Sequence, residues 1–365
     1  MQVTHINSRR WAQGLALLAL LVPATFAPAA AHSLDLGRYL PPPDAAYVAE
    51  EVRVHAAGGY SLAGTLTLPS RGVLRNGHVM RYAAILLLSG AGKDDRDGDA
   101  ADDTTDGYRP LRDLADALTR RGIAVLRLDD RGVGASTGTL DSSTTLDRTD
   151  DARAAIGYLR RRIEVDPKRI GVLGMSEGAS IAALVAATDP DVRGIVLMAG
   201  PGLPGREIAA WQRSKRLAAD PSLSPARRDT SLAGGMAEWD ANAQADPWYR
   251  FFATYDPRVT ARAVAAPALV MQGDDDENVP PAGADSLVAA LRVSGADVSL
   301  RRFPGLGHAF LPPSAFDAGP GASPGALRLP PAILGPVTDW VVAHFGGGVE
   351  GPAPRLKPLH RRRRH

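Results

Sequence analysis

The chain has 365 residues, of which 45% are hydrophobic, and it carries 42 Lys and Arg residues against 40 Asp and Glu residues. That length suits one large domain with an insertion, or two smaller domains. Because the chain contains no cysteine, disulfide bonds and a thiolate nucleophile are both excluded.

The small excess of positive charge comes from the end of the chain, where six bases follow Gly351: Arg355, Lys357 and Arg361 to Arg364. The rest of the chain has more acids than bases. A nucleic-acid-binding domain carries its basic residues on a folded face, so we expect no nucleic-acid partner. Residues 347–365 are predicted to be a disordered basic tail.

The first residues have the pattern of a secretory signal peptide. Arg9 and Arg10 precede an apolar run over residues 14–22, and Ala29 to Ala31 offer small residues for cleavage. The run is shorter than the roughly 18 apolar residues of a membrane span. We therefore predict a signal peptide over residues 1–31, a secreted or periplasmic protein, and no stable membrane insertion after cleavage. Export by the general or the twin-arginine route stays open.

After a hairpin predicted around Gly58 and Gly59, strand-like and helix-like segments alternate along the chain. This alternation predicts an α/β fold, with a mostly parallel sheet covered by helices on both faces. The two parts of this core are expected over residues 45–200 and 267–346. The predicted strands are 84–88, 123–128, 170–173, 194–198, 268–271 and 298–303, and the predicted helices are 111–120, 147–162, 179–187, 284–293 and 331–345.

The alternation stops once, over residues 201–266. Helix-forming residues and aromatics occur there without a strand pattern, which predicts a helical cap inserted into the sheet. The aromatics suit either an acyl-binding pocket or packing of the cap against the sheet. They are Trp211, Trp239, Trp248, Tyr249, Phe251, Phe252 and Tyr255.

The sequence Gly174-Met175-Ser176-Glu177-Gly178 lies between a predicted buried strand and a helix of small residues. A nucleophilic serine at such a sharp strand-to-helix turn needs glycines around it, because Cβ atoms would clash. This setting predicts Ser176 as a catalytic nucleophile.

A serine nucleophile requires a general base, and eight histidines are available. Most of them lie near the termini, before the sheet, or, as with His344, in an apolar terminal helix. His308 follows the last predicted strand in a glycine-rich loop, from which an imidazole can reach over the sheet edge. We predict that His308 is the general base.

The acid that orients this histidine is expected between Ser176 and His308. Asp274, Asp275, Asp276 and Glu277 all follow the predicted strand that ends at Met271. An acidic solvated turn would account for most of these residues, so the residues alone leave the choice open.

An oxyanion hole needs two backbone N–H groups directed at the developing negative charge. One is expected from Glu177, the residue after the nucleophile. The other is expected from the glycine-rich loop Ser89-Gly90-Ala91-Gly92, with the N–H of Ala91 as the candidate.

Together these motifs make the chain resemble bacterial secreted α/β-hydrolases of the serine-aminopeptidase-like branch, over residues 52–345. The resemblance implies an α/β-hydrolase fold, and its acid motif Gly-x-x-Asp-x-x-Val fits Gly273, Asp276 and Val279, which implies Asp276 as the acid. Relatives often carry histidine at the position of Met175 and glycine at that of Ala179. Other matching stretches are 62–66, 95–98, 129–134, 199–202, 255–257 and 305–308.

Two further patterns partly resemble ligand sites. Asp95, Asp97 and Asp99 alternate like the start of a calcium loop, but the sixth position is Ala100 rather than glycine. A solvated acidic loop is favoured there over a loose cation site. The glycines of 132–138 are spaced wrongly for dinucleotide binding. We expect no cofactor and no metal.

Three functions remain open: an esterase, a peptidase that releases small N-terminal residues, and a non-catalytic binding protein on a hydrolase scaffold. The presence of serine, acid and histidine in the required order disfavours the last. The expected substrate is a small uncharged carboxylic ester, because the segment around the predicted cap is rich in aromatics.

Overall fold

The computed structural model describes residues 39–69, 81–99, 107–316 and 327–346. The predicted signal peptide and the predicted basic tail lie outside these residues. Among the helices of the described part, none combines the length and the apolar character that a membrane crossing requires.

Eight strands form one sheet in the order β1-β2-β4-β3-β5-β6-β7-β8. Strand β2 pairs antiparallel with β1 and β4, and all other neighbours pair in parallel. This arrangement confirms the predicted α/β-hydrolase fold. The strands are β1 (Tyr47–His55), β2 (Ser61–Pro69), β3 (Tyr82–Leu88), β4 (Ala124–Leu128), β5 (Val165–Met175), β6 (Val192–Met198), β7 (Ala268–Gly273) and β8 (Val298–Phe303).

Helices cover both faces of the sheet because successive strand residues point to opposite sides. In β3, Ala84 and Leu86 face one core while Ile85 and Leu87 face the other. The first core is closed by α2 (Thr145–Arg161), α3 (Glu177–Thr188) and α8 (Gly283–Val293), and the second by α1 (Pro110–Arg120) and α9 (Pro331–Phe345). A short 3-10 helix spans Pro313–Phe316.

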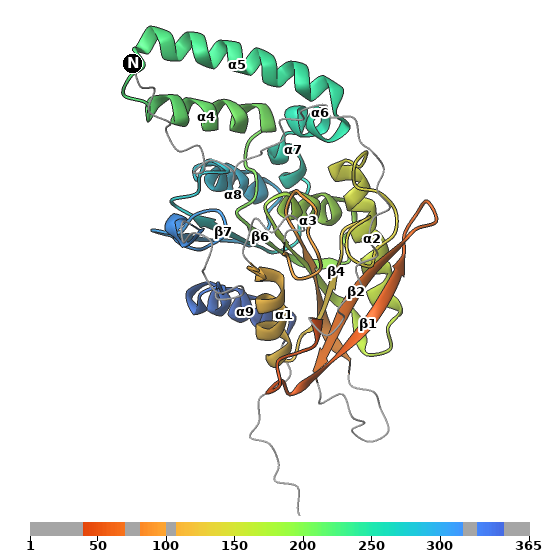
Figure 1. The fold of residues 1–365 in the computed structure, drawn as a ribbon. Helices are drawn as coiled ribbons and strands as arrows, with labels where there is room; N and C mark the ends of the chain where they lie inside the picture. Colours follow the sequence, from red (N-terminus) through yellow and green to blue (C-terminus); the bar gives the residue numbers. More distant parts are fainter. Residues whose placement is uncertain (1–38, 70–80, 100–106, 317–326, 347–365) are drawn as a thin grey trace, which may run out of the picture.

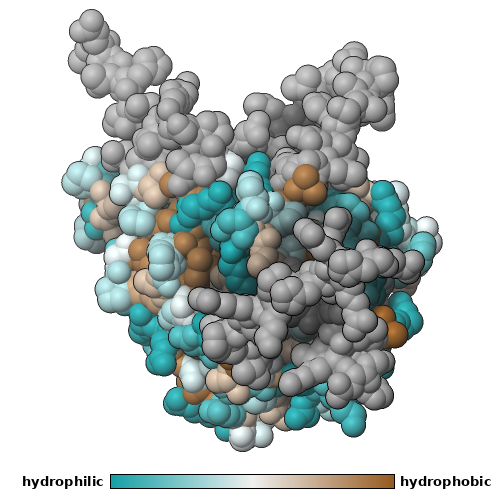
Figure 2. All heavy atoms as spheres, turned by 90° about the horizontal axis from the view of Figure 1, so that it is seen from below, coloured by the Kyte–Doolittle hydropathy of each residue, from teal (hydrophilic) through white to brown (hydrophobic). Residues whose placement is uncertain are grey.

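Four helices lie between β6 and β7, in the segment where the sequence predicts a helical cap. They are α4 (Gly205–Ala218), α5 (Pro225–Ala245), α6 (Pro247–Thr254) and α7 (Pro257–Ala261). Helices α4 and α5 lie at the end of the molecule away from the β1–β2 hairpin (Figure 1). On the opposite face, hydrophilic and hydrophobic side chains of the described residues are interspersed (Figure 2).

The acidic loop before α1 is not the solvated loop that the sequence favours. Asp95 and Asp97 are buried, and Asp97 pairs with the buried Arg127 of β4. Between them, Arg96 is fully buried and pairs with Asp129 at 2.9 Å. Burying a charge is costly unless it is paired, and here Asp97 and Arg96 find partners, Arg127 and Asp129, that lie about 30 residues further along the chain. Among the described residues, no group of acids and histidines is arranged to hold a metal ion.

Candidate active site

Four of the five predicted site residues follow the carboxyl end of a parallel strand, and the fifth, Glu177, begins the helix after Ser176. Ala91 comes after β3, Ser176 after β5, Asp276 after β7 and His308 after β8. The carboxyl ends of parallel strands meet at one edge of the sheet, where open α/β sheets bind their ligands. The sheet therefore brings these four residues to the same edge.

Ser176 occupies a strained turn between β5 and α3. Its φ of 52° is in the left-handed region, which residues other than glycine rarely adopt, and its N–H donates to the carbonyl of Met198 at 2.8 Å. A Cβ at Gly174 would overlap the carbonyl oxygen of Gly178. The observed backbone is thus the sharp turn that the glycine spacing predicts.

The glycine-rich loop after β3 runs against this turn. A Cβ on Gly90 would lie 3.3 Å from Cβ and 3.8 Å from Oγ of Ser176, and a Cβ on Gly178 would overlap the carbonyl oxygen of Ser89. Backbone therefore packs directly on backbone at the nucleophile. The loop that carries Ala91 therefore lies directly beside the turn that carries Ser176 and Glu177.

Asp276 and His308 are in direct contact. Nδ1 of His308 lies 2.9 Å from Oδ2 of Asp276. The same carboxylate accepts hydrogen bonds from the Gln272 amide at 2.8 Å and from the backbone N–H groups of Asn278 and Val279 at 2.8 and 2.9 Å. A carboxylate held on both oxygens fixes the orientation of the imidazole.

These contacts also fix the charge of Asp276. Burial by itself would raise the pKa of this carboxyl, but the positive charge and hydrogen bond of His308, with the donors at Val279 and Gln272, lower the pKa below its ordinary value. Asp276 therefore stays ionised throughout the pH range in which a histidine ordinarily titrates.

The neighbouring acids lie elsewhere. Asp275 is exposed, Asp274 pairs with Arg302 at 3.0 Å, and Glu277 pairs with Lys215 at 3.3 Å on the surface. The sequence leaves four acids open. In the described part of the chain, Asp276 is the one of these four that contacts His308. The acid motif and the geometry thus select the same residue.

The loop that carries His308 is tied to its surroundings by backbone contacts. The N–H of Asp275 donates to the carbonyl of Leu306 at 3.0 Å, and the N–H of Gly307 donates to the carbonyl of Leu311 at 2.8 Å. The hydroxyl of Tyr108 donates to the carbonyl of Ala309 at 2.6 Å. The histidine is therefore positioned by a folded loop.

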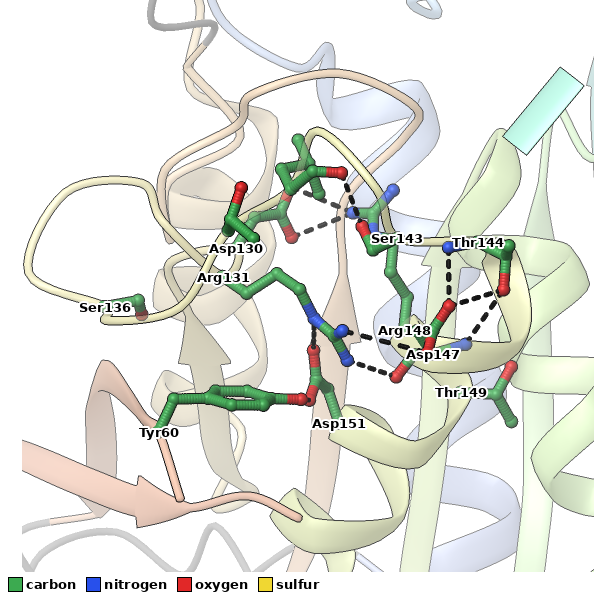
Figure 3. Close-up of polar contacts among 12 residues, drawn as sticks. Tyr60, Asp130, Arg131, Ser136, Ser143, Thr144, Asp147, Arg148, Thr149 and Asp151 are labelled. Atoms are coloured by element: carbon green, nitrogen blue, oxygen red, sulfur yellow. Dashed lines mark hydrogen bonds and ion pairs between the residues drawn. The ribbon is translucent and has the colours of Figure 1, made fainter. Parts of the chain in front are cut away.

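Sequence reasoning missed a buried ionic network beside the nucleophile. The carboxylate of Glu177 accepts from Arg148 at 2.5 Å, from the hydroxyl of Thr145 at 2.5 Å and from the indole N–H of Trp248 at 2.7 Å. Arg148 also contacts Asp130 at 2.8 Å, and Figure 3 draws Arg148 with Asp130 and the start of α2. The network joins the nucleophile turn to α2 and, through Trp248, to α6.

A signal for Arg148 exists in the sequence. It occupies the same face of α2 as Ala152, Ala155 and Leu159, four, seven and eleven residues later. An arginine in line with residues that a helix buries indicates a buried acidic partner. The signal does not identify which acid that partner is.

Comparison with known proteins adds the family. A family model described as "Serine aminopeptidase, S33" matches residues 105–312. A monoacylglycerol lipase from Mycolicibacterium smegmatis is 28% identical over 252 residues, which are 64% of this chain and 82% of the lipase. A protein from Mycobacterium tuberculosis is 31% identical over 209 residues, 55% of this chain and 59% of its own length.

Solved structures share the fold at low sequence identity. An esterase from Pyrococcus furiosus superposes with a TM-score of 0.56 at 16% identity, over 84% of this chain and 94% of the esterase. A Butyrivibrio proteoclasticus protein with bound ferulic acid gives a TM-score of 0.51 at 15% identity, over 80% and 98%. The family model spans more than half of the chain, including the serine turn and the His308 loop. The chain therefore belongs to the S33 serine aminopeptidase family of α/β-hydrolases.

Proposed function

We propose that this protein is a serine esterase that cleaves small uncharged carboxylic esters through an acyl-enzyme on Ser176. The observation that carries the proposal is the hydrogen bond between His308 and the buried Asp276, at the same sheet edge as the strained Ser176 turn. The names of similar proteins, a monoacylglycerol lipase and an esterase, point in the same direction.

In the proposed reaction, Oγ of Ser176 attacks the ester carbonyl while His308 takes the hydroxyl proton. The N–H groups of Ala91 and Glu177 stabilise the negative oxygen that forms. His308 then gives its proton to the departing alcohol, which leaves the acyl group on Ser176. A water molecule, deprotonated in turn by His308, releases the acid and restores the serine.

The acids of the helical segment favour esters over peptides. An aminopeptidase must bind the α-ammonium of its substrate with a carboxylate, because an unpaired charge is costly to desolvate. Asp240 pairs with Arg206 and Asp256 with Arg258, and Asp246 caps the first turn of α6. Glu207 lies 4.0 Å from Arg258. These four carboxylates are thus engaged locally, and a further acid of the segment, Glu238 on α5, is exposed.

Peptidase activity is the second candidate function, for which the acid to consider is Asp94. Oδ2 of Asp94 lies 3.9 Å from the position of a Cβ on Gly90, and Oγ of Ser176 lies 3.8 Å from that same position. The Asp94 side chain therefore lies near the nucleophile, and it also has interactions of its own. The family description, serine aminopeptidase, agrees with this candidate.

The deciding experiment compares kcat/KM for p-nitrophenyl acetate and butyrate with kcat/KM for alanine and proline p-nitroanilides. We expect the esters to be preferred after correction for leaving-group reactivity. A fluorophosphonate probe should label the wild-type protein and not Ser176→Ala, which should remain folded by circular dichroism. A folded Ser176→Ala variant that keeps a tenth of the activity contradicts the role of Ser176.

Preference for an anilide would instead support the peptidase, and Asp94→Asn should then raise KM for the anilide while leaving ester hydrolysis in place.

We also propose export of the protein, on the basis of residues 1–31. Sequencing the N-terminus of protein recovered from the periplasm or medium tests this, with a start near His32 expected.

A further inference from the structure

One guanidinium nitrogen contacts both halves of the candidate oxyanion hole. Nη1 of Arg148 donates to the carbonyl oxygen of Gly90 at 2.8 Å and to Oε2 of Glu177 at 2.5 Å. The two candidate donors of the oxyanion hole are close to these contacts in the chain. The N–H of Ala91 belongs to the same peptide unit as the Gly90 carbonyl, and the other donor is the backbone N–H of Glu177 itself.

The Gly90–Ala91 peptide needs such a contact. It joins Gly90 to Ala91, so a flip of this peptide changes ψ of Gly90 and φ of Ala91. Glycine is conformationally permissive because it has no Cβ, so the Gly90 side of the peptide does little to prevent it from turning over. A flip would direct its carbonyl oxygen, instead of its N–H, toward the substrate.

The contact with Arg148 selects one orientation. In a trans peptide the C=O and N–H bonds point in opposite directions, and no peptide bond of the described residues is cis. Because the Gly90 carbonyl points to Arg148, the N–H of Ala91 points away from it. Ser176 lies close to Gly90, so the carbonyl bond to Arg148 governs how the N–H is presented at the nucleophile.

Arg148 is itself held rigidly. Its Nη2 donates to the carboxylate of Asp130 at 2.8 and 2.9 Å and to the hydroxyl of Ser89 at 3.1 Å. The side chain is buried. Burial by itself would lower the pKa of Arg148, but the charges of Asp130 and Glu177 outweigh it and raise the pKa, so the cation is retained. A planar guanidinium meets these partners simultaneously in a way that a lysine ammonium does not.

We propose that Arg148 is a positioning residue for the oxyanion hole. Its single guanidinium group fixes both the Gly90–Ala91 peptide and the Glu177 turn. The inference rests on the proposed serine hydrolase function. It concerns the transition state: the donors act on the negative oxygen that appears only during the reaction. Losing their alignment should lower kcat and leave ground-state binding nearly unchanged.

The neighbouring Arg131 provides a matched control. It is also buried, and it donates to Asp151 at 2.7 Å and to the carbonyl of Asp147 at 2.6 Å. It therefore anchors a loop to α2 as Arg148 does, as Figure 3 shows for both arginines. No contact joins Arg131 to Gly90 or Glu177 among the contacts of the described residues.

The test compares Arg148→Lys with Arg131→Lys, using p-nitrophenyl butyrate and a trifluoromethyl ketone as a transition-state analogue. For Arg148→Lys we expect kcat to fall about 100-fold, the size of effect that follows loss of an oxyanion-hole donor. KM should change by less than about threefold, and the inhibition constant of the ketone should rise in parallel with the loss of kcat/KM. Arg131→Lys should stay within about threefold of wild type in all three quantities.

If Arg148→Lys does not fold, Glu177→Gln takes its place, because it keeps the backbone N–H but removes the carboxylate that anchors it. We then expect about a tenfold fall in kcat with the same parallel change in ketone affinity. Equal activities of the folded Arg148 and Arg131 variants, or a loss confined to KM, would overturn this inference alone. A wild-type protein that neither turns over esters nor is labelled on Ser176 would overturn the proposed function, and this inference with it.

Discussion

The sheet and the helical segment of residues 205–261 differ in how much of their surface they bury. All six residues of β7 are buried, whereas no residue of α6 is. Asp276 and His308 follow sheet strands and Ser176 lies between a strand and a buried helix. The helical segment instead reaches the site through side chains such as Trp248, which contacts Glu177. The candidate catalytic residues thus follow the most deeply buried part of the fold, as fixed geometry requires, while α6 is the least buried helix of the segment beside them.

The aromatics of the helical segment follow the same division. Trp248 stacks on Phe252 and Phe251 stacks on Tyr255, each with ring centroids 5.0 Å apart, and none of these four rings is fully buried. Both stacked pairs are contacts within the helical segment itself. Between the two interpretations that the sequence offers, packing of the segment onto the sheet therefore accounts for less of this aromatic surface than the composition suggests.

The largest effect is expected at the acid on the sheet edge. Asp276→Asn should lower kcat/KM by about ten-thousand-fold, because an amide favours the wrong histidine tautomer. Asp275→Asn, at an exposed neighbouring position, should stay within about threefold of wild type. Steady-state kinetics with a p-nitrophenyl ester measure both. Equal, small losses at the two positions would remove Asp276 from the site.

The same variant has a pH signature in stability. Because the pKa of Asp276 is lowered in the folded state, its carboxylate stabilises the fold at pH values above its ordinary pKa of 3.8. That contribution is lost as the pH falls through the lower folded-state value. The difference in unfolding free energy between wild type and Asp276→Asn should therefore be largest near neutral pH and shrink below pH 3.8.

A second pair of variants tests the difference in burial directly. Val270 in β7 is 2% exposed and Val259 in α7 is 61% exposed. Val270→Ala should cost about 2 to 3 kcal/mol of unfolding free energy, through lost burial and the cavity left behind. Val259→Ala should change stability by less than about 0.5 kcal/mol. Denaturant unfolding followed by circular dichroism is the measurement, and similar costs at both sites would contradict the division drawn here.

The smallest effect is expected where the two regions meet. Trp248→Phe removes the hydrogen bond to Glu177 and should cost about 1 kcal/mol, because Arg148 and Thr145 still satisfy that carboxylate. Hydrogen exchange should become faster in α6. The matched substitution Trp211→Phe, in a tryptophan whose ring centroid lies 5.4 Å from Nζ of Lys215, should leave exchange in α6 as it is. Identical exchange in the two variants would mean that Trp248 does not tie the segment to the sheet.

The sequence alone predicted the order of the elements and several of their bounds. The last strand and the last helix were predicted as they occur, Val298–Phe303 and Pro331–Phe345, because apolar runs bounded by Gly and Pro are local signals. Strand β5 is longer than predicted. Its polar first half has no hydrophobic pattern, yet Val165 pairs with Tyr82 on β3, and such pairing depends on a distant strand.

Local patterns likewise led to Ser176 and His308, since glycine spacing and chain order are written in the sequence itself. Tertiary structure alone decided which buried charges are partners: Asp97 with Arg127, and Arg148 with both Glu177 and Asp130. An ion pair forms between side chains that folding brings together and removes from water, and no spacing along the chain specifies that meeting. For this physical reason the solvated interpretation of the acidic loop is wrong, and the helical pattern that indicates a buried Arg148 does not identify its partners.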